Sequence, residues 1–291
     1  MIEGVLPALI TPFTKDNEVD EEGLRQNIEF LIEGGVSGIV PCGTTGESAT
    51  LSMSEHEHVV EIAINSSTVP IVAGTGSNNT IEALELTKSA EDAGADAALL
   101  ITPYYNKPND RGMIAHFKAI SHAVDLPLIL YNVPSRTGIN LKPEVVADLA
   151  RESNIIGIKE ASGNLEQITR IIELTQDEDF VIFSGDDALT LPIMALGGVG
   201  VISVVANVAP SLVVSMVKAF QKGDMKEARK IHIELAPLIR AAFLETNPIP
   251  IKKAVELIGL PAGALRLPLA SISADNEKKL RTALNDLHLL K

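Results

Sequence analysis

The feature that most constrains the fold is a unit that recurs along the chain: a helical segment, a glycine turn and a short apolar run. The unit is clearest around residues 34–40, 93–100 and 196–202. The apolar runs do not alternate with polar residues, which is typical of parallel strands that are buried on both faces. Eight such runs are present, at Val5–Ile10, Gly38–Cys42, Pro70–Ala73, Ala97–Ile101, Pro127–Tyr131, Ile155–Lys159, Phe180–Phe183 and Gly198–Ser203.

Eight units of this kind predict an α/β fold in which parallel strands close into a (β/α)8 TIM barrel; a doubly wound open sheet is the alternative. Helix starts are indicated by the capping residue Asp20 and by the capping-box pattern Ser54-x-x-Glu57. We place the barrel, which carries the active site, at residues 1–222. Because the chain then looks helical, we place a C-terminal helical extension at 223–291.

Composition limits the classes of function. A length of 291 residues with 46% hydrophobic residues suits one barrel with additions. The net charge of −14 argues against nucleic acid or an anionic membrane as a partner and favours small molecules. Cys42 is the sole cysteine, which excludes an intramolecular disulfide. The start of the chain lacks the pattern of a signal peptide, so we expect a cytoplasmic protein. The uncharged stretch 188–217 is interrupted by prolines and glycines, so we expect no membrane span there.

Chemically useful side chains gather where the predicted strands end. The carboxyl ends of the strands form the active-site face of a (β/α)8 barrel. The second run is followed by Gly43-Thr44-Thr45-Gly46-Glu47, the sixth ends in Lys159, and the seventh is followed by 184–187. All three tyrosines, Tyr104, Tyr105 and Tyr131, fall at the same face. This concentration indicates an active site.

Lys159 follows an apolar strand and has two interpretations. A buried lysine is usually paired, and Glu160 is the nearest acid in the sequence. Burial can also lower the pKa of a lysine by several units, which makes the neutral amine a nucleophile for a carbonyl carbon. The neighbouring tyrosines, which can relay protons, favour the nucleophile.

Other polar groups could bind a substrate. The Gly43–Gly46 turn offers hydroxyl and backbone N–H groups for a carboxylate or an oxyanion, although an ordinary tight turn has the same sequence. Arg136 could hold a carboxylate through two hydrogen bonds, or it could be a solvated surface residue. His56 and His58 do not share a helix face, and Gly74-x-Gly76 lacks the third glycine of a dinucleotide motif. We therefore predict no metal and no cofactor.

These residues together resemble the dihydrodipicolinate synthase family of lysine-dependent pyruvate aldolases, which includes N-acetylneuraminate lyase. The resemblance runs through essentially the whole chain. It is carried by the motifs 9–13, 43–51, 131–138, 247–250 and 265–268.

The resemblance implies a Schiff-base mechanism that condenses pyruvate with aspartate 4-semialdehyde in lysine and diaminopimelate biosynthesis. Lys159 matches the family's nucleophile, Tyr131 its proton donor and acceptor, and Thr44 the relay partner. Tyr105 matches the relay tyrosine that reaches into the neighbouring subunit. The remaining matches are substrate-binding positions, namely Thr45, Gly185 and Ile202 for pyruvate and Arg136 for the semialdehyde carboxylate. The resemblance also implies a homo-oligomer, with a tetramer built as a dimer of dimers.

Two other functions remain open at this point. The same lysine chemistry serves aldolases that form pyruvate from a 2-keto-3-deoxy sugar acid or N-acetylneuraminate, and the barrel could bind a keto acid without catalysis. Arg136 favours the synthase, since a polyol substrate has no use for a second carboxylate clamp. Met53 stands where lysine-inhibited members of the family tend to carry a histidine, so feedback inhibition also remains open.

Overall fold

The computed structural model describes residues 2–290, and its contacts divide the chain into two compact units. The first unit consists of the residues up to Ile71 together with those from Ser203 onward. The second unit is the intervening segment, Val72–Ile202.

The second unit is a parallel sheet whose strands follow one another in chain order. The strands are β2 (Val72–Gly74), β3 (Ala97–Ile101), β4 (Leu128–Asn132), β5 (Ile155–Glu160), β6 (Val181–Ser184) and β7 (Gly200–Ser203). Every pair from β2–β3 to β6–β7 is parallel, as the predicted order of the runs requires. The strands are almost entirely buried, and the core therefore lies along the sheet.

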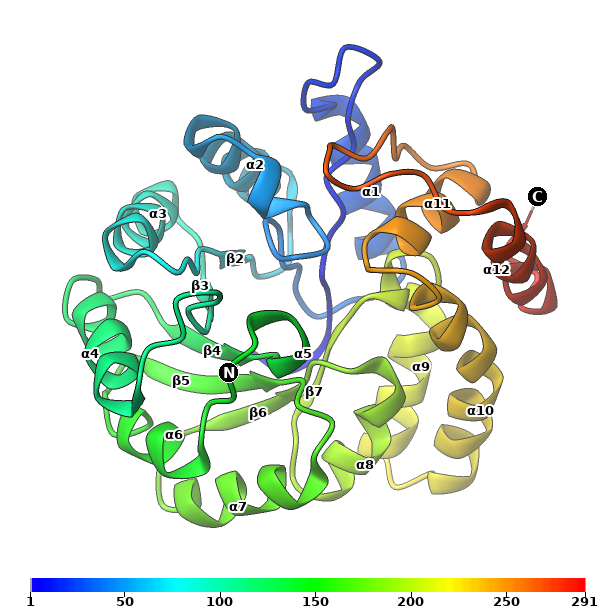
Figure 1. Ribbon diagram of the computed structural model, residues 1–291. Helices are drawn as coiled ribbons and strands as arrows, with labels where there is room; N and C mark the ends of the chain where they lie inside the picture. Colours follow the sequence, from blue (N-terminus) through cyan, green and yellow to red (C-terminus); the bar gives the residue numbers. More distant parts are fainter. Residues whose placement is uncertain (1, 291) are drawn as a thin grey trace. The chain divides into compact units, whose positions relative to one another are not determined.

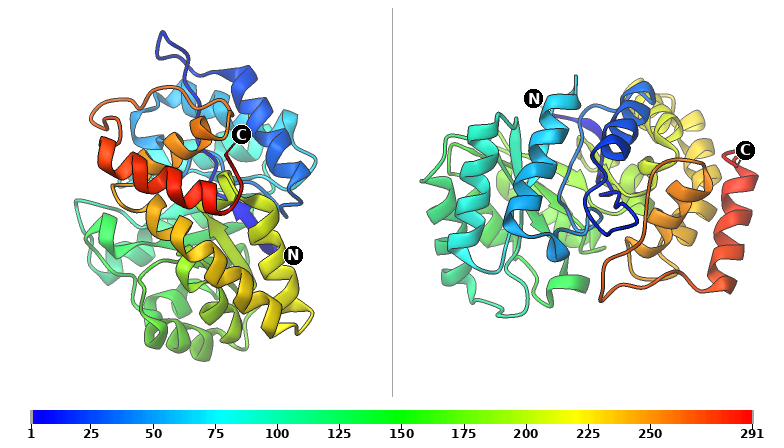
Figure 2. Two further views of the ribbon diagram at one scale, coloured as in Figure 1. Left: turned by 90° about the vertical axis from the view of Figure 1, so that its right-hand side faces the viewer. Right: turned by 90° about the horizontal axis from the view of Figure 1, so that it is seen from above.

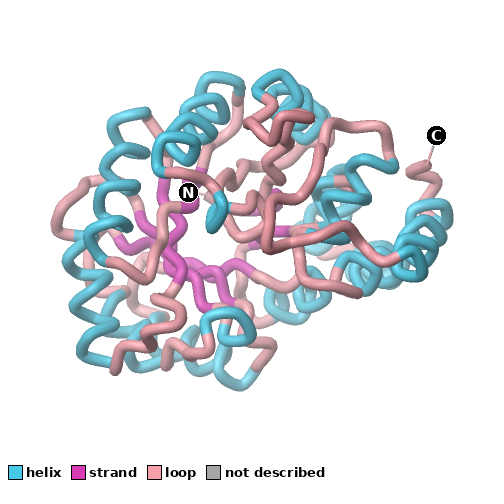
Figure 3. The backbone as a smooth tube through the Cα atoms, turned by 45° about the horizontal axis from the view of Figure 1, so that its top comes forward, coloured by secondary structure: helices cyan, strands magenta, loops and turns pink. Residues whose placement is uncertain are grey.

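Helices of the second unit follow its strands and cover one side of the sheet (Figures 1 and 3). They are α3 (Thr80–Ala93), α4 (Asp110–Ser121), α6 (Pro143–Leu149), α7 (Leu165–Thr175) and α8 (Thr190–Ala195), with the 3-10 helix η2 (Asp187–Leu189) before α8. The short helix α5 (Pro134–Thr137) follows β4 and does not belong to this layer (Figure 1). Their side chains cover one face of the strands, while the strand ends and the loops that follow them stay available for chemistry.

The first unit contains one short strand and most of the long helices. Its elements are β1 (Gly4–Pro7), α1 (Glu21–Glu33), η1 (Ser48–Thr50), α2 (Met53–Ser66), η3 (Val205–Asn207), α9 (Pro210–Gln221), α10 (Met225–Ala242), α11 (Ile249–Leu257) and α12 (Ala274–Asp286). Helix α10 packs against α9, and α12 lies against α10 and α11 (Figure 2). The helical segments predicted after residue 223 are confirmed.

One predicted strand is shorter than expected. The run Gly38–Cys42 makes only two isolated parallel bridges, Ala8 with Val40 and Ile39 with Ile71. Pro41 has no N–H to donate to a ladder, and the φ of +54° at Cys42 turns the chain away from the extended conformation. The extended segment therefore ends at Pro41, directly after the bridge made by Val40.

The predicted helix starts had different outcomes. Asp20 caps α1 by accepting a 3.0 Å hydrogen bond from the Gly23 backbone N–H, as predicted. The capping box of α2, however, is formed by Ser52 and Glu55. The prediction was two residues late because Ser54-x-x-Glu57 has the same spacing as the true pair.

The uncharged stretch 188–217 is broken into η2, α8, β7, η3 and α9, as predicted. Among the described residues no helix is both long and apolar enough to cross a membrane.

Candidate active site

Lys159 lies near the end of β5, between the ends of two neighbouring strands. The parallel register pairs it with Tyr131 of β4 on one side and with Phe183 of β6 on the other. The Lys159 Nζ atom is 4.2 Å from the centroid of the Tyr131 ring. Lys159 is only 5% exposed, and Tyr131 is buried as well. The sheet thus brings together the two residues that the sequence placed at the centre of the site.

The surroundings of Lys159 favour a neutral amine. Burial lowers the pKa of Lys159 to about 7; the charge of Asp187 acts in the opposite direction, and the charge of Arg136 lowers the pKa further. Asp187 begins η2 directly after β6, and Arg136 lies on α5 directly after β4. About half of the Lys159 side chains are therefore neutral at pH 7, whereas an unperturbed lysine is almost fully charged. Such an amine can attack a carbonyl carbon.

Glu160 does not form the ion pair that was the alternative interpretation of Lys159. Successive strand residues point to opposite faces, so the Glu160 side chain leaves the sheet on the other side. Its carboxyl group accepts hydrogen bonds from Asn132 Nδ2 at 3.0 Å, Gln167 Nε2 at 3.3 Å and the Ser162 backbone N–H at 2.6 Å. Burial raises the pKa of Glu160, while these three donors act in the opposite direction.

The polar cluster around Glu160 also holds the segment that follows α5. Asn132 Oδ1 accepts a 3.0 Å hydrogen bond from the Leu141 backbone N–H, and Asn132 Nδ2 donates to Asn140 Oδ1 at 2.8 Å. Asn140 in turn donates to Gln167 Oε1 at 2.7 Å. These contacts fix the exit of the loop that carries Arg136. Sequence reasoning missed Asn132, Asn140 and Gln167; the signal was an asparagine directly after Tyr131, within a strand that is otherwise apolar.

Gly185 is required by the close approach of the loop to Lys159. A Cβ atom at this position would lie 2.7 Å from Ala161 Cβ and 3.1 Å from Lys159 Cγ. Its backbone N–H donates to the Glu160 carbonyl oxygen at 2.8 Å. Gly185 therefore lies against the stem of Lys159.

The remaining predicted residues of the second unit differ in exposure. Ile202 is buried in β7, whereas Arg136 is exposed. The Tyr105 side chain is 87% exposed and its residue has a φ of +69°, so the structure does not bring it against Lys159. Tyr104, at the same strand end, is partly buried.

Thr44 and Thr45 belong to the first unit, where they form a tight turn. The Gly46 backbone N–H donates to the Gly43 carbonyl oxygen at 3.0 Å, which closes the turn. Thr44 is partly exposed, while Thr45 is buried and its Oγ1 accepts a 2.9 Å hydrogen bond from Asn247 Nδ2. In this turn the side chain of Thr45 is therefore held in place by Asn247, whereas Thr44 is partly accessible to solvent.

Among the described residues, no group of three or more His, Cys, Asp or Glu side chains is arranged to hold a metal ion.

The chain is similar to known proteins over almost its whole length. A model of the dihydrodipicolinate synthetase family matches residues 1–287. The chain belongs to this family. A relative from Methanosarcina mazei, a 4-hydroxy-tetrahydrodipicolinate synthase, is 62% identical over 290 residues, which cover 100% of both chains.

Solved structures of the dihydrodipicolinate synthetase family extend the agreement to three dimensions. The dihydrodipicolinate synthase of Aquifex aeolicus has a TM-score of 0.97 at 45% identity and covers 99% of each chain. A monomeric dihydrodipicolinate synthase variant has a TM-score of 0.97 at 40% identity, covering 99% of this chain and 98% of its own. The predicted fold class, an α/β TIM barrel with C-terminal helices, is thereby confirmed.

Proposed function

We propose that this chain is a Schiff-base-forming lyase that condenses pyruvate with L-aspartate 4-semialdehyde to give 4-hydroxy-tetrahydrodipicolinate. The observation that carries the proposal is the buried Lys159, whose pKa is lowered to about 7, with its Nζ atom 4.2 Å from the centroid of the Tyr131 ring. Membership of the family and the M. mazei relative support the choice of substrates.

In the proposed reaction the Lys159 amine attacks the keto carbon of pyruvate, and water is lost as the imine forms. Loss of a methyl proton gives an enamine, whose carbon adds to the aldehyde of the semialdehyde. The amine of the semialdehyde then displaces Lys159 and closes the ring. Tyr131, Thr44 and, reaching in from a neighbouring subunit, Tyr105 move the protons in these steps.

Substrate binding is assigned to four further residues. Thr45, Gly185 and Ile202 bind pyruvate, and Gly185 is supported by its contact with the stem of Lys159. Arg136 binds the carboxylate of the semialdehyde, which suits an exposed guanidinium at the end of β4. We further propose that residues 1–222 form the catalytic barrel and 223–291 a helical extension, and that the protein is a cytoplasmic homotetramer built as a dimer of dimers.

The decisive experiment traps the imine. The protein is treated with pyruvate and borohydride, and its mass and peptide map are compared with those of Lys159→Met. We expect a stable adduct, equal to one pyruvate less water plus two hydrogens, on Lys159 alone. An unchanged mass would refute the lyase, and labelling of the variant would show that another lysine reacts.

A second experiment tests the choice of acceptor through Arg136. Because its charge lowers the pKa of Lys159, Arg136→Ala should also weaken imine formation near neutral pH. Imine formation is therefore measured with pyruvate alone at about pH 9, where even a less acidified Lys159 has more neutral amine. We expect imine formation to recover there while semialdehyde turnover remains strongly reduced. Unchanged semialdehyde kinetics would point to a sugar-acid aldolase instead.

A further inference from the structure

The first unit contains a second buried lysine, with a direct counter-ion. Lys252 of α11 is 2% exposed, and its Nζ donates to Glu47 Oε1 at 2.6 Å and to the Ala264 carbonyl oxygen at 2.8 Å. The other carboxylate oxygen of Glu47 accepts a 3.0 Å hydrogen bond from the Arg266 backbone N–H. Both oxygens of Glu47 are thus used by donors from the C-terminal part of the chain.

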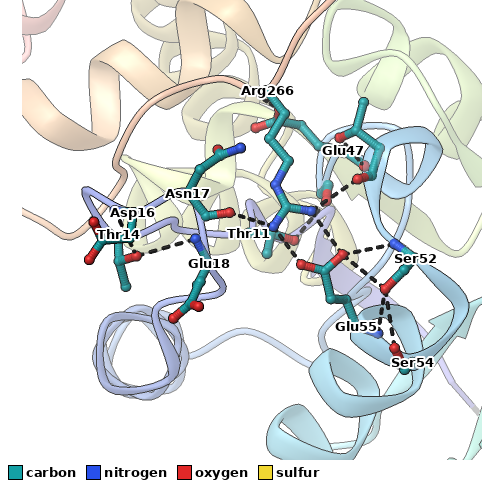
Figure 4. Close-up of polar contacts among 12 residues, drawn as sticks. Thr11, Thr14, Asp16, Asn17, Glu18, Glu47, Ser52, Ser54, Glu55 and Arg266 are labelled. Carbon is teal, nitrogen blue, oxygen red and sulfur yellow. Dashed lines mark hydrogen bonds and ion pairs between the residues drawn. The ribbon is translucent and has the colours of Figure 1, made fainter.

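Arg266 extends this cluster to the start of α2 (Figure 4). Its guanidinium donates to the Asn17 carbonyl oxygen at 2.7 Å and the Thr50 carbonyl oxygen at 2.9 Å, and it pairs with the Glu55 carboxylate. The hydrogen bonds from Arg266 lower the pKa of Glu55 to about 2.

The Phe13 ring lies within cation–π distance of both cations. Lys252 Nζ lies 4.0 Å from the ring centroid and Arg266 Cζ lies 4.1 Å from it. The C-terminal segment approaches the backbone of Phe13 so closely that a Cβ atom on Gly263 would lie 1.9 Å from the Phe13 carbonyl oxygen. Cation–π contacts and close packing thus fix Lys252 and Arg266 in place.

An arrangement of this kind is costly for a purely structural purpose. Removing two charges from water costs several kcal/mol per ion, and apolar residues of similar size are often as stable or more stable. Burial lowers the pKa of Lys252 to about 8 even though Glu47 acts in the opposite direction. Glu47 also has a φ of +56°, a conformation that is unfavourable for a residue with a side chain. Costs of this kind are characteristic of functional sites.

Glu47 directly follows the turn that carries Thr44 and Thr45. Its backbone N–H donates to the Thr44 carbonyl oxygen at 3.2 Å. The preceding residue, Gly46, is held as well: its carbonyl oxygen accepts a 2.7 Å hydrogen bond from Thr11 Oγ1. The turn is therefore held through Glu47 at its exit, through Gly46 and, by way of Asn247, through Thr45.

We propose that Glu47 is a positioning residue: its carboxylate, held by Lys252 and the Arg266 backbone, fixes the Gly43–Gly46 turn so that Thr44 and Thr45 act on pyruvate. This inference rests on the proposed function of the two threonines. It gives the C-terminal extension a role in the reaction, because helix α11 and the segment around Arg266 supply the donors that hold the turn.

The test variant is Glu47→Gln. A glutamine has one acceptor oxygen, so its amide nitrogen must face either the Lys252 ammonium or the Arg266 N–H, which are both donors. The turn then shifts, and a misplacement of about 1 Å can cost on the order of 10²-fold in rate. We expect kcat to fall because Thr44 is displaced from its proton-transfer position, and the KM for pyruvate to rise because Thr45 is displaced from its binding position. Together these changes should reduce kcat/KM by roughly 10²-fold.

The matched control is Glu55→Gln, which removes the same charge from the same cluster and keeps the capping box, since glutamine serves at that position. We expect kcat/KM for this variant within about twofold of the wild type, as for a substitution away from the reacting groups. Both variants are assayed well below their unfolding midpoints. If Glu47→Gln does not fold, Lys252→Met replaces it, because methionine has a similar length and removes the ammonium that holds Glu47 Oε1; this variant is less stable and is assayed at a temperature where it is fully folded.

Equal kinetic losses in the two glutamine variants would overturn the positioning role, and so would normal kinetics in Glu47→Gln or its replacement. These results are distinct from failure of the proposed function, which would appear as a wild-type protein that forms no borohydride-trapped adduct with pyruvate. That last result would overturn both proposals.

Discussion

The lowered pKa of Lys159 has a consequence for stability that is independent of any substrate. The pKa of Lys159 is about 7 in the folded protein, against 10.5 for the ordinary side chain. At about 1.36 kcal/mol for each pKa unit, the difference of roughly 3.5 corresponds to a cost of about 5 kcal/mol for holding the charged form in the folded state. Replacing the lysine with an apolar side chain of similar length removes this cost.

The sign and the pH range follow from linkage. The folded state binds the Lys159 proton more weakly than the unfolded state, so the destabilisation is complete below about pH 7 and is lost as the pH rises toward 10.5. We therefore expect Lys159→Met to be more stable than the wild type at pH 7. The advantage should shrink by roughly 2 kcal/mol between pH 7 and pH 9.

The measurement is the free energy of unfolding in urea, followed by circular dichroism at several pH values for both proteins. Packing differences between lysine and methionine add a constant to the comparison, whereas the ionisation cost gives a slope. A difference between the two proteins that does not vary from pH 7 to pH 9 would refute the assignment of a low pKa to Lys159.

Three further outcomes are expected. The rate of imine formation with pyruvate should rise roughly tenfold from pH 6 to pH 8 and then level off, because the neutral fraction of Lys159 increases through a pKa of about 7; a rate that keeps rising to pH 10 would contradict this. Gly157→Ala should destabilise the protein by about 1–3 kcal/mol in urea unfolding, since its Cβ would lie 2.6 Å from the Val181 carbonyl oxygen on β6; an unchanged midpoint would show that the strands yield. Cys42 should resist thiol reagents in the native protein, because burial raises the pKa of its thiol, and it should react once urea unfolds the chain; rapid native labelling would show an accessible thiol.

Local sequence signals were sufficient for most of the strands and for the pair Tyr131 and Lys159. The apolar runs placed β3, β4 and β5 to within a residue, and the register between β4 and β5 then brings Tyr131 beside Lys159. The errors are equally local. The run Gly38–Cys42 looks like a strand in composition, but Pro41 and the left-handed Cys42 end it early.

The contacts that hold the site were beyond the reach of local patterns. Glu47 is separated by 205 residues from Lys252 and by 219 from Arg266 in the sequence, and neither partner stands in a pattern that names the other. Lys252 lies in an apolar helical segment, where a lysine is ordinarily taken for a solvated side chain. Only the folded chain shows that it is buried against a carboxylate.

The two buried lysines, Lys159 and Lys252, differ in the groups that surround their ammonium. Burial lowers the pKa of both, to about 7 for Lys159 and about 8 for Lys252. Lys252 has a carboxylate at 2.6 Å and a carbonyl oxygen at 2.8 Å, so its ammonium is satisfied where it lies. Among the described residues Lys159 makes no direct ion pair, and its Nζ faces the Tyr131 ring. Lys252→Met should therefore destabilise the protein by about 3–5 kcal/mol, because it leaves the Glu47 carboxylate buried without its partner, whereas Lys159→Met should stabilise it. Opposite signs for the same substitution at two buried lysines would show that the lack of a direct ion pair, rather than burial alone, makes Lys159 available for reaction.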